Sequence, residues 1–281
     1  MARPMGTADI GGCFTGTLAR FAGTIRTDDG GPGLAADRLL DPDTVRDLIE
    51  RYAASLPGAD PRAIVSMWSQ WHCAAVVTPA VVACVIARHR LPVALEDCRL
   101  ALHDNGCTAA VLVPAAAPGM AAAERVPEDR IPEDRIPDDR SGSAPVGTRR
   151  HSGFGDLLDG HLAPLIAFIA REFAVSPKLL WTNAAASFAW TLQQCAARPE
   201  ADSAALSEAE GRLTLAEAWP TGRNPFAGAL RPSPFVPLEQ CSRRVCCLRY
   251  LLPGWADCGS FCPLPARDRP AGAADNPAGD P

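Results

Sequence analysis

The sequence predicts a mainly helical α+β protein. We expect a small antiparallel hairpin or sheet in the N-terminal half and a loop-rich C-terminal region that carries a cysteine cluster. Three observations predict this fold class. Apolar residues recur at helical spacing in several segments. An Asn-Gly pair at residues 105–106 separates two apolar runs, and four of the eleven cysteines fall between residues 246 and 262.

Composition limits the class of protein and its compartment. The chain has 281 residues, 47% of them hydrophobic and 21% charged, which suits a protein with a substantial core. A net charge of −5 at pH 7 argues against a general nucleic-acid-binding protein. The N-terminus has no basic region followed by an apolar core, and the most apolar run, Cys73 to Ala87, is too short to span a membrane. We therefore expect a cytoplasmic protein with no integral membrane segment.

Three helices are expected in the first 95 residues. Asp41-Pro42 is typical of a helix start, because a carboxylate there complements the positive end of the helix dipole. Gly58 closes this helix, and Asp60-Pro61 begins the second. Thr78-Pro79 is expected to cap the third, which runs from Ala80 to His89.

A β-hairpin is expected next. Residues 95–102 and 107–113 are both rich in apolar side chains and flank the turn residues 103–106. Asn105-Gly106 is the strongest local hairpin signal because it suits a type I′ turn. The sequence therefore predicts a small antiparallel sheet at this place.

The chain changes character between residues 114 and 150. A pentapeptide of the form Arg-(Val/Ile)-Pro-(Glu/Asp)-Asp occurs three times from Arg125. Proline at every fifth residue prevents a continuous helix, and mixed charge keeps the segment solvated. We expect a disordered insert, and binding of a partner by the repeat at residues 125–140 is the alternative.

Helical periodicity resumes after the insert. A helix is expected from Asp156 through Ile169, another after Ser176-Pro177, and a third, shorter one within residues 205–219. A proline-rich extended stretch then leads to the cysteines, and the residues after Pro263 are expected to be disordered. The predicted organisation is a helical part with the hairpin (1–113), the insert (114–150), a second helical part (151–222), the cysteine region (223–265) and a tail (266–281).

The cysteine cluster has three possible interpretations. Disulfides are typical of exported, usually small proteins, which this chain does not resemble. Zinc sites usually hold ligands in two short C-x(2–4)-C knuckles, whereas Cys246 and Cys247 are adjacent and their side chains diverge from the backbone. A two-iron cluster spreads its ligand positions more widely, so adjacent cysteines can serve different irons. On spacing alone an iron–sulfur centre, a zinc site and inert or redox-active thiols all stay open.

A family resemblance rests on the residues around these cysteines. The run from Arg243 to Tyr250 contains Cys246-Cys247, and ten residues separate Cys247 from Cys258-Gly259. This resembles the C-terminal signature of the FhuF family, bacterial ferric-siderophore reductases that bind a [2Fe–2S] cluster on a Cys-Cys-x10-Cys-x2-Cys motif. Cys246, Cys247 and Cys258 match its first three ligand positions.

The fourth ligand position departs from the family pattern. Cys262 follows Cys258 after three residues, where the motif has two. Cys262 is the predicted fourth ligand, and Cys241, five residues before Cys246, is the alternative.

The resemblance implies an oxidoreductase that acts on metal ions: a cytoplasmic ferric-siderophore reductase. It would bind a [2Fe–2S] cluster and reduce the Fe(III) of a siderophore, of the hydroxamate type, by one electron. The chain has no G-x-G-x-x-G motif after a strand, so the electron is expected from a separate ferredoxin, flavodoxin or reductase. Peripheral association with an uptake transporter is compatible with this interpretation.

Residues other than the cysteines were also weighed. Arg243, Arg244 and Arg249 are placed to supply positive charge and N–H donors to a cluster of net negative charge, and the alternative is that they are surface arginines. His72 and His89 flank the apolar helix and are expected to mark its ends rather than to bind iron. Two other functions stay open: a zinc-stabilised binding module, and an iron–sulfur electron carrier without reductase activity.

Overall fold

The computed structural model describes residues 10–114, 154–215, 224–231, 240–255 and 261–264. These residues form a mainly helical α+β fold, as predicted. The longer elements, in chain order, are β1 (Ile25–Asp28), β2 (Leu34–Ala35), α2 (Pro42–Ala54), α3 (Pro61–Val85), β3 (Arg99–Leu102), β4 (Thr108–Pro114), a π-helix η3 (Asp156–Leu162), α4 (Ala163–Glu172), α5 (Pro177–Ala196), α6 (Ser203–Thr214), β5 (Leu230–Arg231) and β6 (Ser242–Arg243). The 3₁₀ helices are η1 (Gly16–Phe21), η2 (Ala36–Leu40) and η5 (Arg249–Leu251).

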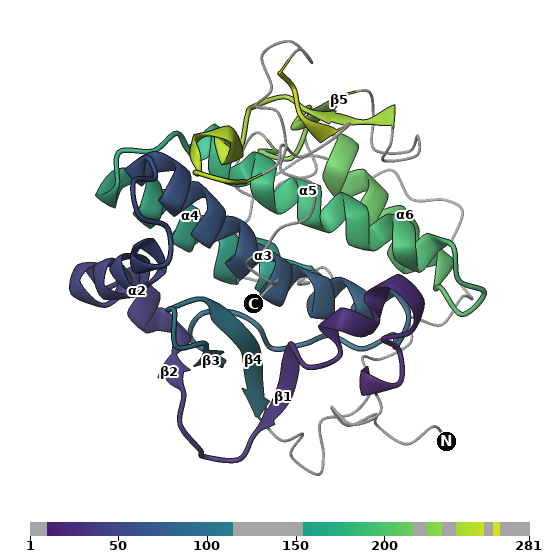
Figure 1. Ribbon diagram of the computed structural model, residues 1–281. Coiled ribbons are helices and arrows are strands. Elements are labelled where there is room, and N and C mark those ends of the chain that lie inside the picture. Colours follow the sequence, from purple (N-terminus) through teal and green to yellow (C-terminus); the bar gives the residue numbers. More distant parts are fainter. Residues whose placement is uncertain (1–9, 115–153, 216–223, 232–239, 256–260, 265–281) are drawn as a thin grey trace, which may run out of the picture.

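The elements lie in three layers (Figure 1). A four-stranded sheet forms one side, α3 and α5 run side by side through the middle, and the ribbon of β5 and β6 lies on the opposite side of these helices. The middle layer therefore separates the sheet from the cysteine region, and α3 contacts both.

Helix α3 is continuous from Pro61 to Val85, so the prediction of two helices divided at Thr78-Pro79 is wrong. Pro79 lacks an N–H and cannot make the usual hydrogen bond to the preceding turn, which should interrupt a solvated helix. Here the surrounding turn is fully packed, and the Thr78 hydroxyl lies 3.2 Å from the Thr191 hydroxyl of α5. Tertiary packing outweighs the local cost of the proline.

The length of α3 also bears on the membrane prediction. By length and composition alone this helix would be able to cross a membrane, but 78% of its apolar window is buried inside the protein. Within the described part of the chain no other helix meets that test. Because its side chains pack against the sheet, α5 and the cysteine region, α3 is the central helix of the core.

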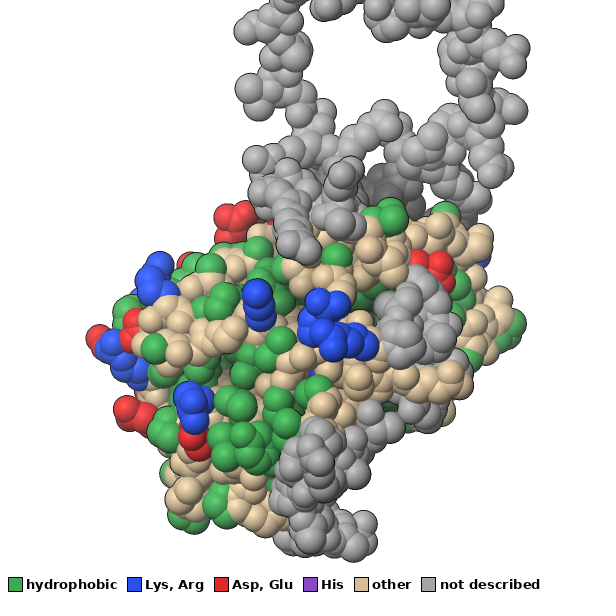
Figure 2. All heavy atoms as spheres, turned by 90° about the horizontal axis from the view of Figure 1, so that it is seen from above, with side chains coloured by type: hydrophobic (Ala, Val, Ile, Leu, Met, Phe, Trp, Pro, Cys, Tyr) green, Lys and Arg blue, Asp and Glu red, His purple; other side chains and the backbone are tan. Residues whose placement is uncertain are grey.

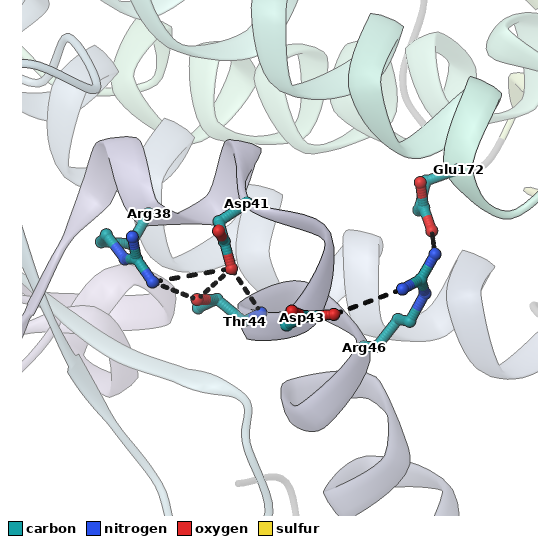
Figure 3. A network of polar contacts seen from close by, with 6 residues as sticks. All are labelled: Arg38, Asp41, Asp43, Thr44, Arg46 and Glu172. Atoms are coloured by element: carbon teal, nitrogen blue, oxygen red, sulfur yellow. Dashed lines mark hydrogen bonds and ion pairs between the residues drawn. The ribbon is translucent and has the colours of Figure 1, made fainter.

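Helix α2 begins at the predicted place. The Asp41 side chain accepts a hydrogen bond from the Thr44 backbone N–H at 2.9 Å, which is the standard N-cap arrangement. Arg38 donates to the Thr44 hydroxyl, and Arg46 forms an ion pair with Glu172 of α4 (Figure 3). These polar contacts fix α2 against its own approach segment and against α4.

The sheet contains the predicted hairpin but is larger and of mixed direction. Its order is β1-β4-β3-β2, with β3 and β4 antiparallel and β1 parallel to β4. Strands β1 and β2 lie outside the predicted hairpin, and both are short and lie in the Gly-rich N-terminal segment. The pairing of Ile25 with Val111 is a long-range contact that no local pattern indicates.

The hairpin turn differs from the predicted type I′. Gly106 has φ +81°, but Asn105 has a negative φ, whereas a type I′ turn needs positive φ at both central residues. The Gly106 N–H donates to the His103 carbonyl, and the His103 N–H donates to the Cys107 carbonyl. This is a longer connection with glycine at the left-handed position, and the backbone of Leu48 in α2 packs directly against Gly106.

The predicted helices after the insert are present, with altered boundaries. The segment from Asp156 starts as the π-helix η3 and continues as α4, and α5 begins at Pro177 as expected. The third helix, α6, starts at Ser203. The predicted insert (114–150), with the repeat at 125–140, lies outside the described residues except for Pro114. The predicted tail (266–281) lies wholly outside them.

Candidate functional site

Four of the isolated cysteines, Cys73, Cys98, Cys107 and Cys195, are buried side chains of the hydrophobic core. Cys98, Cys107 and Cys195 are at most 5% exposed, and burial raises the pKa of each thiol to about 12. Cys73 of α3 behaves in the same way. Such thiols stay protonated at neutral pH and are poor nucleophiles.

The clustered cysteines lie in the segment that follows β6. Cys246 is half-buried, whereas Cys247 and Cys262 are 2% and 6% exposed. Cys258, the third predicted ligand, lies outside the described residues. Cys241, the alternative fourth ligand, is 1% exposed and directly precedes β6.

Cys246 is within electrostatic range of two other clustered thiols, Cys247 and Cys262. The thiols of Cys246 and Cys247 are hydrogen-bonded, although adjacent side chains were expected to diverge. This hydrogen bond, followed by burial, raises the pKa of Cys246 far above its ordinary value, and negative charge on Cys247 or Cys262 raises it further. The structure thus brings Cys262 into electrostatic reach of the vicinal pair.

The backbone after the vicinal pair is turned toward a sulfur. Leu248 has φ +63°, a left-handed conformation that is uncommon for a residue other than glycine. In this conformation the Leu248 N–H donates to Cys246 Sγ at 3.4 Å. Backbone strain of this kind persists only where the surroundings require it, and it is frequent at functional sites.

A buried polar network anchors the vicinal pair to the middle layer. The Ser66 hydroxyl of α3 donates to the Cys247 carbonyl at 2.7 Å. Asn183 of α5 donates its side-chain amide to the Ser66 carbonyl at 3.0 Å and lies 3.3 Å from the Ser69 hydroxyl. Both long helices therefore position the backbone of Cys247.

Arg243 completes this network from β6. It is 5% exposed, donates to the Asn183 side-chain oxygen, and donates to Gln70 Oε1 at 3.2 Å. Its guanidinium lies 5.4 Å from the ring centre of Phe261, the residue before Cys262. Its buried Nε has no hydrogen-bond partner in the described part of the chain.

The three arginines expected at the site have different surroundings. Arg243 is buried, Arg244 is exposed, and Arg249 in η5 stacks over Trp255 at 4.7 Å from the ring centre. Tyr250, beside Arg249, is 39% exposed. Figure 2 shows this side of the molecule from above Figure 1, with Lys and Arg side chains near the middle of the face and others at its left edge beside Asp and Glu.

The donor chemistry of the site fits an iron–sulfur cluster. Neighbouring thiols, an N–H aimed at one sulfur and a buried cation are the groups that such a cluster uses for ligation and charge compensation. Among the described residues no set of three or more His, Cys, Asp or Glu side chains is arranged to hold a metal ion, and Cys258 is not one of the described residues.

The histidines lie on the other side of α3. His72 is in the interior of the helix, not at its end as predicted, and His89 follows the helix. His72 Nε2 lies 2.9 Å from His161 Nε2, His72 Nδ1 lies 2.8 Å from the Thr108 hydroxyl, and His161 Nδ1 lies 2.6 Å from the Val93 carbonyl. Burial lowers the pKa of both, that of His161 to about 4. The pair is a neutral hydrogen-bonded unit between α3, η3 and the sheet.

The sequence analysis missed the residues that anchor the cysteine loop. Ser66, Ser69 and Gln70 follow the spacing i, i+3, i+4, which places three polar side chains on one face of an otherwise apolar helix. Asn183 follows Thr182 in α5 and is fully buried. Polar residues buried in this pattern need partners, so the spacing was an available signal for a polar contact on this face.

A comparison with protein families gives one match. The family model described as "Ferric iron reductase FhuF-like transporter" matches residues 66–234, which is more than half of the chain. The match includes Ser66, Gln70 and Asn183 and ends before the clustered cysteines. No curated protein matched the chain.

Proposed function

The chain belongs to the FhuF-like ferric iron reductase family, and on this basis we propose that it reduces the ferric iron of a hydroxamate-type siderophore to ferrous iron. Electrons would pass, one at a time, through a [2Fe–2S] centre on Cys246, Cys247, Cys258 and Cys262.

One observation carries this proposal. The family match and the cysteine motif lie in different parts of the chain, and the structure joins them through hydrogen bonds. Ser66, at the start of the matched region, donates to the Cys247 carbonyl at 2.7 Å. Asn183, further along that region, contacts both Ser66 and Arg243. Helices α3 and α5, which lie mostly or wholly in the matched region, thus support the cysteine loop.

The residues of the site have separate tasks in this proposal. Thiolates are the usual ligands of iron–sulfur clusters, and when bound such a cluster supplies one-electron transfer. Leu248 N–H lowers the electron density on Cys246 Sγ by hydrogen bonding, and Ser66 fixes the Cys247 backbone. The shielding of Cys247 and Cys262 from solvent keeps their thiolates from competing reactions.

Reduction releases iron because Fe(III) and Fe(II) prefer different ligands. Siderophore oxygens are hard ligands that suit Fe(III) and hold the softer Fe(II) much less well. One electron enters the chain from its donor and leaves to the chelate, so Fe(III) becomes Fe(II) and the siderophore itself is not consumed. Trapping of Fe(II) draws the reaction forward when the chelate has a very negative potential.

The partners follow from what the chain has and lacks in its sequence. Without a recognisable nicotinamide motif, it would take electrons from a separate ferredoxin, flavodoxin or reductase. The Lys and Arg side chains near the middle of this face (Figure 2) would attract an acidic donor or an anionic chelate. We place the reaction in the cytoplasm, where a peripheral contact with an uptake transporter would deliver the substrate.

A comparison of the iron and gallium complexes of one siderophore-type ligand tests the reaction. The full chain is reconstituted anaerobically, reduced with dithionite, freed of excess reductant and mixed with a ferric trihydroxamate in the presence of a ferrous-specific chelator. The gallium(III) complex of the same ligand is the control, because it has the same charge and nearly the same size but is not reduced. Oxidation of the protein by the iron complex alone, with one Fe(II) trapped per electron, supports the proposal. Equal spectra with both complexes contradict it.

A further inference from the structure

Arg243 presents a physical problem that its described surroundings do not solve. Only 5% of the residue is exposed, yet the described partners of its guanidinium are the neutral side chains of Asn183, Gln70 and Phe261. Amide oxygens supply dipoles, but they carry no charge to offset the cation. An unpaired buried charge costs several kcal/mol, so proteins normally place an anion beside it.

Other arginines of the chain show the usual solution. Arg90 and Arg99 keep 37% and 31% of their side chains exposed, and each still forms an ion pair with an aspartate. Arg46 pairs with Glu172. Arg243 is far more buried than any of these, and its Nε–H is left without a described acceptor. The described structure therefore holds a cation in excess at this place.

The position of Arg243 indicates which anion it serves. Its guanidinium is fixed through Asn183 and Ser66 to the Cys247 carbonyl, and it stacks over Phe261, which precedes Cys262. Arg243 itself lies three residues before Cys246. Two cysteine-bearing segments thus converge on one buried positive charge.

We propose that Arg243 is the built-in counter-charge of the cysteine site: its guanidinium offsets the negative charge of the metal-bound thiolates, and Asn183 and Gln70 hold it in position. This rests on the proposed function for the identity of the bound group. Four thiolates, two sulfides and two ferric ions carry a net charge of about −2, and one more electron makes it about −3. A fixed cation favours the state with more negative charge, so Arg243 raises the reduction potential.

A redox titration of the reconstituted full chain tests this. Arg243→Gln and Asn183→Asp both remove net positive charge at the same point, the first by deleting the cation and the second by placing a carboxylate against it. Each should lower the ratio of reduced to oxidised protein at a fixed poise at least tenfold, which is about 59 mV for one electron. Arg243→Lys keeps the charge and should restore most of the ratio.

Arg231→Gln is the matched control. Arg231 lies on β5, the strand paired with β6, but it is exposed, so solvent screens its charge. Its replacement should leave the potential unchanged. Potentials of Arg243→Gln and Asn183→Asp equal to that of the unsubstituted chain would overturn the proposal, as would an equal shift on replacing Arg231.

The metal-free chain gives a second readout. If Arg243 awaits an anion, Arg243→Met should unfold at the same urea concentration as the unsubstituted apo-protein or at a higher one, because a buried unpaired cation is removed. A large loss of apo-protein stability would assign Arg243 a structural role instead and overturn the proposal. Failure of the proposed function looks different: the cluster would form and its potential would respond to Arg243, but ferric hydroxamates would not oxidise it.

Discussion

Leu248 decides how the vicinal cysteines present their sulfurs. With φ +63° it reverses the chain directly after Cys247, and its N–H reaches back to Cys246 Sγ at 3.4 Å. The Ser66 hydroxyl donates a hydrogen bond to the carbonyl of Cys247, the second residue of this pair. At this scale the site consists of two sulfurs with a fixed backbone and a third thiol, that of Cys262, within electrostatic reach of Cys246.

Serine replacements separate the two candidates for the fourth ligand. Cys262→Ser should abolish or strongly reduce cluster binding, because the thiol of Cys262 is within electrostatic reach of Cys246. Cys241→Ser is the control, since Cys241 is also buried and lies in the same region. Iron and acid-labile sulfide per chain, with the visible spectrum, give the result. Loss of colour in the Cys241 variant alone would transfer the ligand role to Cys241.

The buried histidine pair makes stability depend on pH. Because the Val93 carbonyl accepts only, His161 Nδ1 carries a proton, and in the neutral pair His72 Nε2 donates to His161 Nε2. Burial lowers the pKa of His161 from 6.5 to about 4, so the unfolded chain binds more protons than the folded chain between these values. The histidines' contribution to the free energy of unfolding is therefore fully present above the unfolded-state pKa of 6.5. It falls as the pH drops, by about 1.4 kcal/mol per pH unit for each histidine.

Urea unfolding between pH 4 and 7 measures this dependence. Replacing both His72 and His161 by Gln should flatten the slope by the share of the two histidines. An unchanged slope in the double variant would show that the pair does not titrate on unfolding.

At the scale of elements, α3 joins the two sides of the molecule. One face presents Trp68 and His72 to the hairpin, where the Trp68 Nε1–H donates to the Gly106 carbonyl at 3.0 Å. Another presents Ser66 and Gln70 to the cysteine region. Residues 66–72 of α3 thus contact both the hairpin and the cysteine region.

The close contact between the hairpin turn and α2 depends on Gly106. Its φ is +81°, and a Cβ at this position would collide with the Leu48 backbone. Gly106→Ala should therefore cost about 3 kcal/mol of unfolding free energy, at the upper end for a single substitution. Gly58→Ala is the control, because Gly58 has φ +80° but open space at its Cβ, and should cost only about 1 kcal/mol. Equal losses in urea unfolding would mean that the contact with α2 contributes nothing.

At the scale of the whole molecule, the sheet, the helix pair and the cysteine region form three layers, and the candidate site lies on the outer side of the helices. Residues from both sides of the 115–153 segment meet there. Ser66 and Asn183, for example, are 117 positions apart and hydrogen-bonded. The site is therefore a product of the folded chain rather than of the cysteine segment alone.

Local features of this fold were predictable from the sequence, and non-local ones were not. The Asp41 cap, the start of α5 at Pro177 and the hairpin depend on neighbouring residues, and each is present. Pro79 was misinterpreted because packing against α5 overrides its helix-breaking tendency. Strand β1 was missed because its partner lies 86 positions away, in the pairing of Ile25 with Val111.

The candidate site divides in the same way. The cysteine spacing and the nearby arginines were readable in sequence, but their surroundings were not. Nothing local distinguishes buried Arg243 from exposed Arg244, since the difference arises from contacts with α3 and α5. The anchoring role of Ser66 and Asn183 likewise depends on the packing of helices distant in sequence.

The metal and sulfide content of the full chain is the most direct test of the central claim. After anaerobic reconstitution with iron and sulfide, the account predicts two irons and two acid-labile sulfides per chain, a red-brown colour, and loss of all three in Cys247→Ser. One tightly bound zinc per chain in freshly isolated protein, or neither iron nor sulfide after reconstitution, would contradict it.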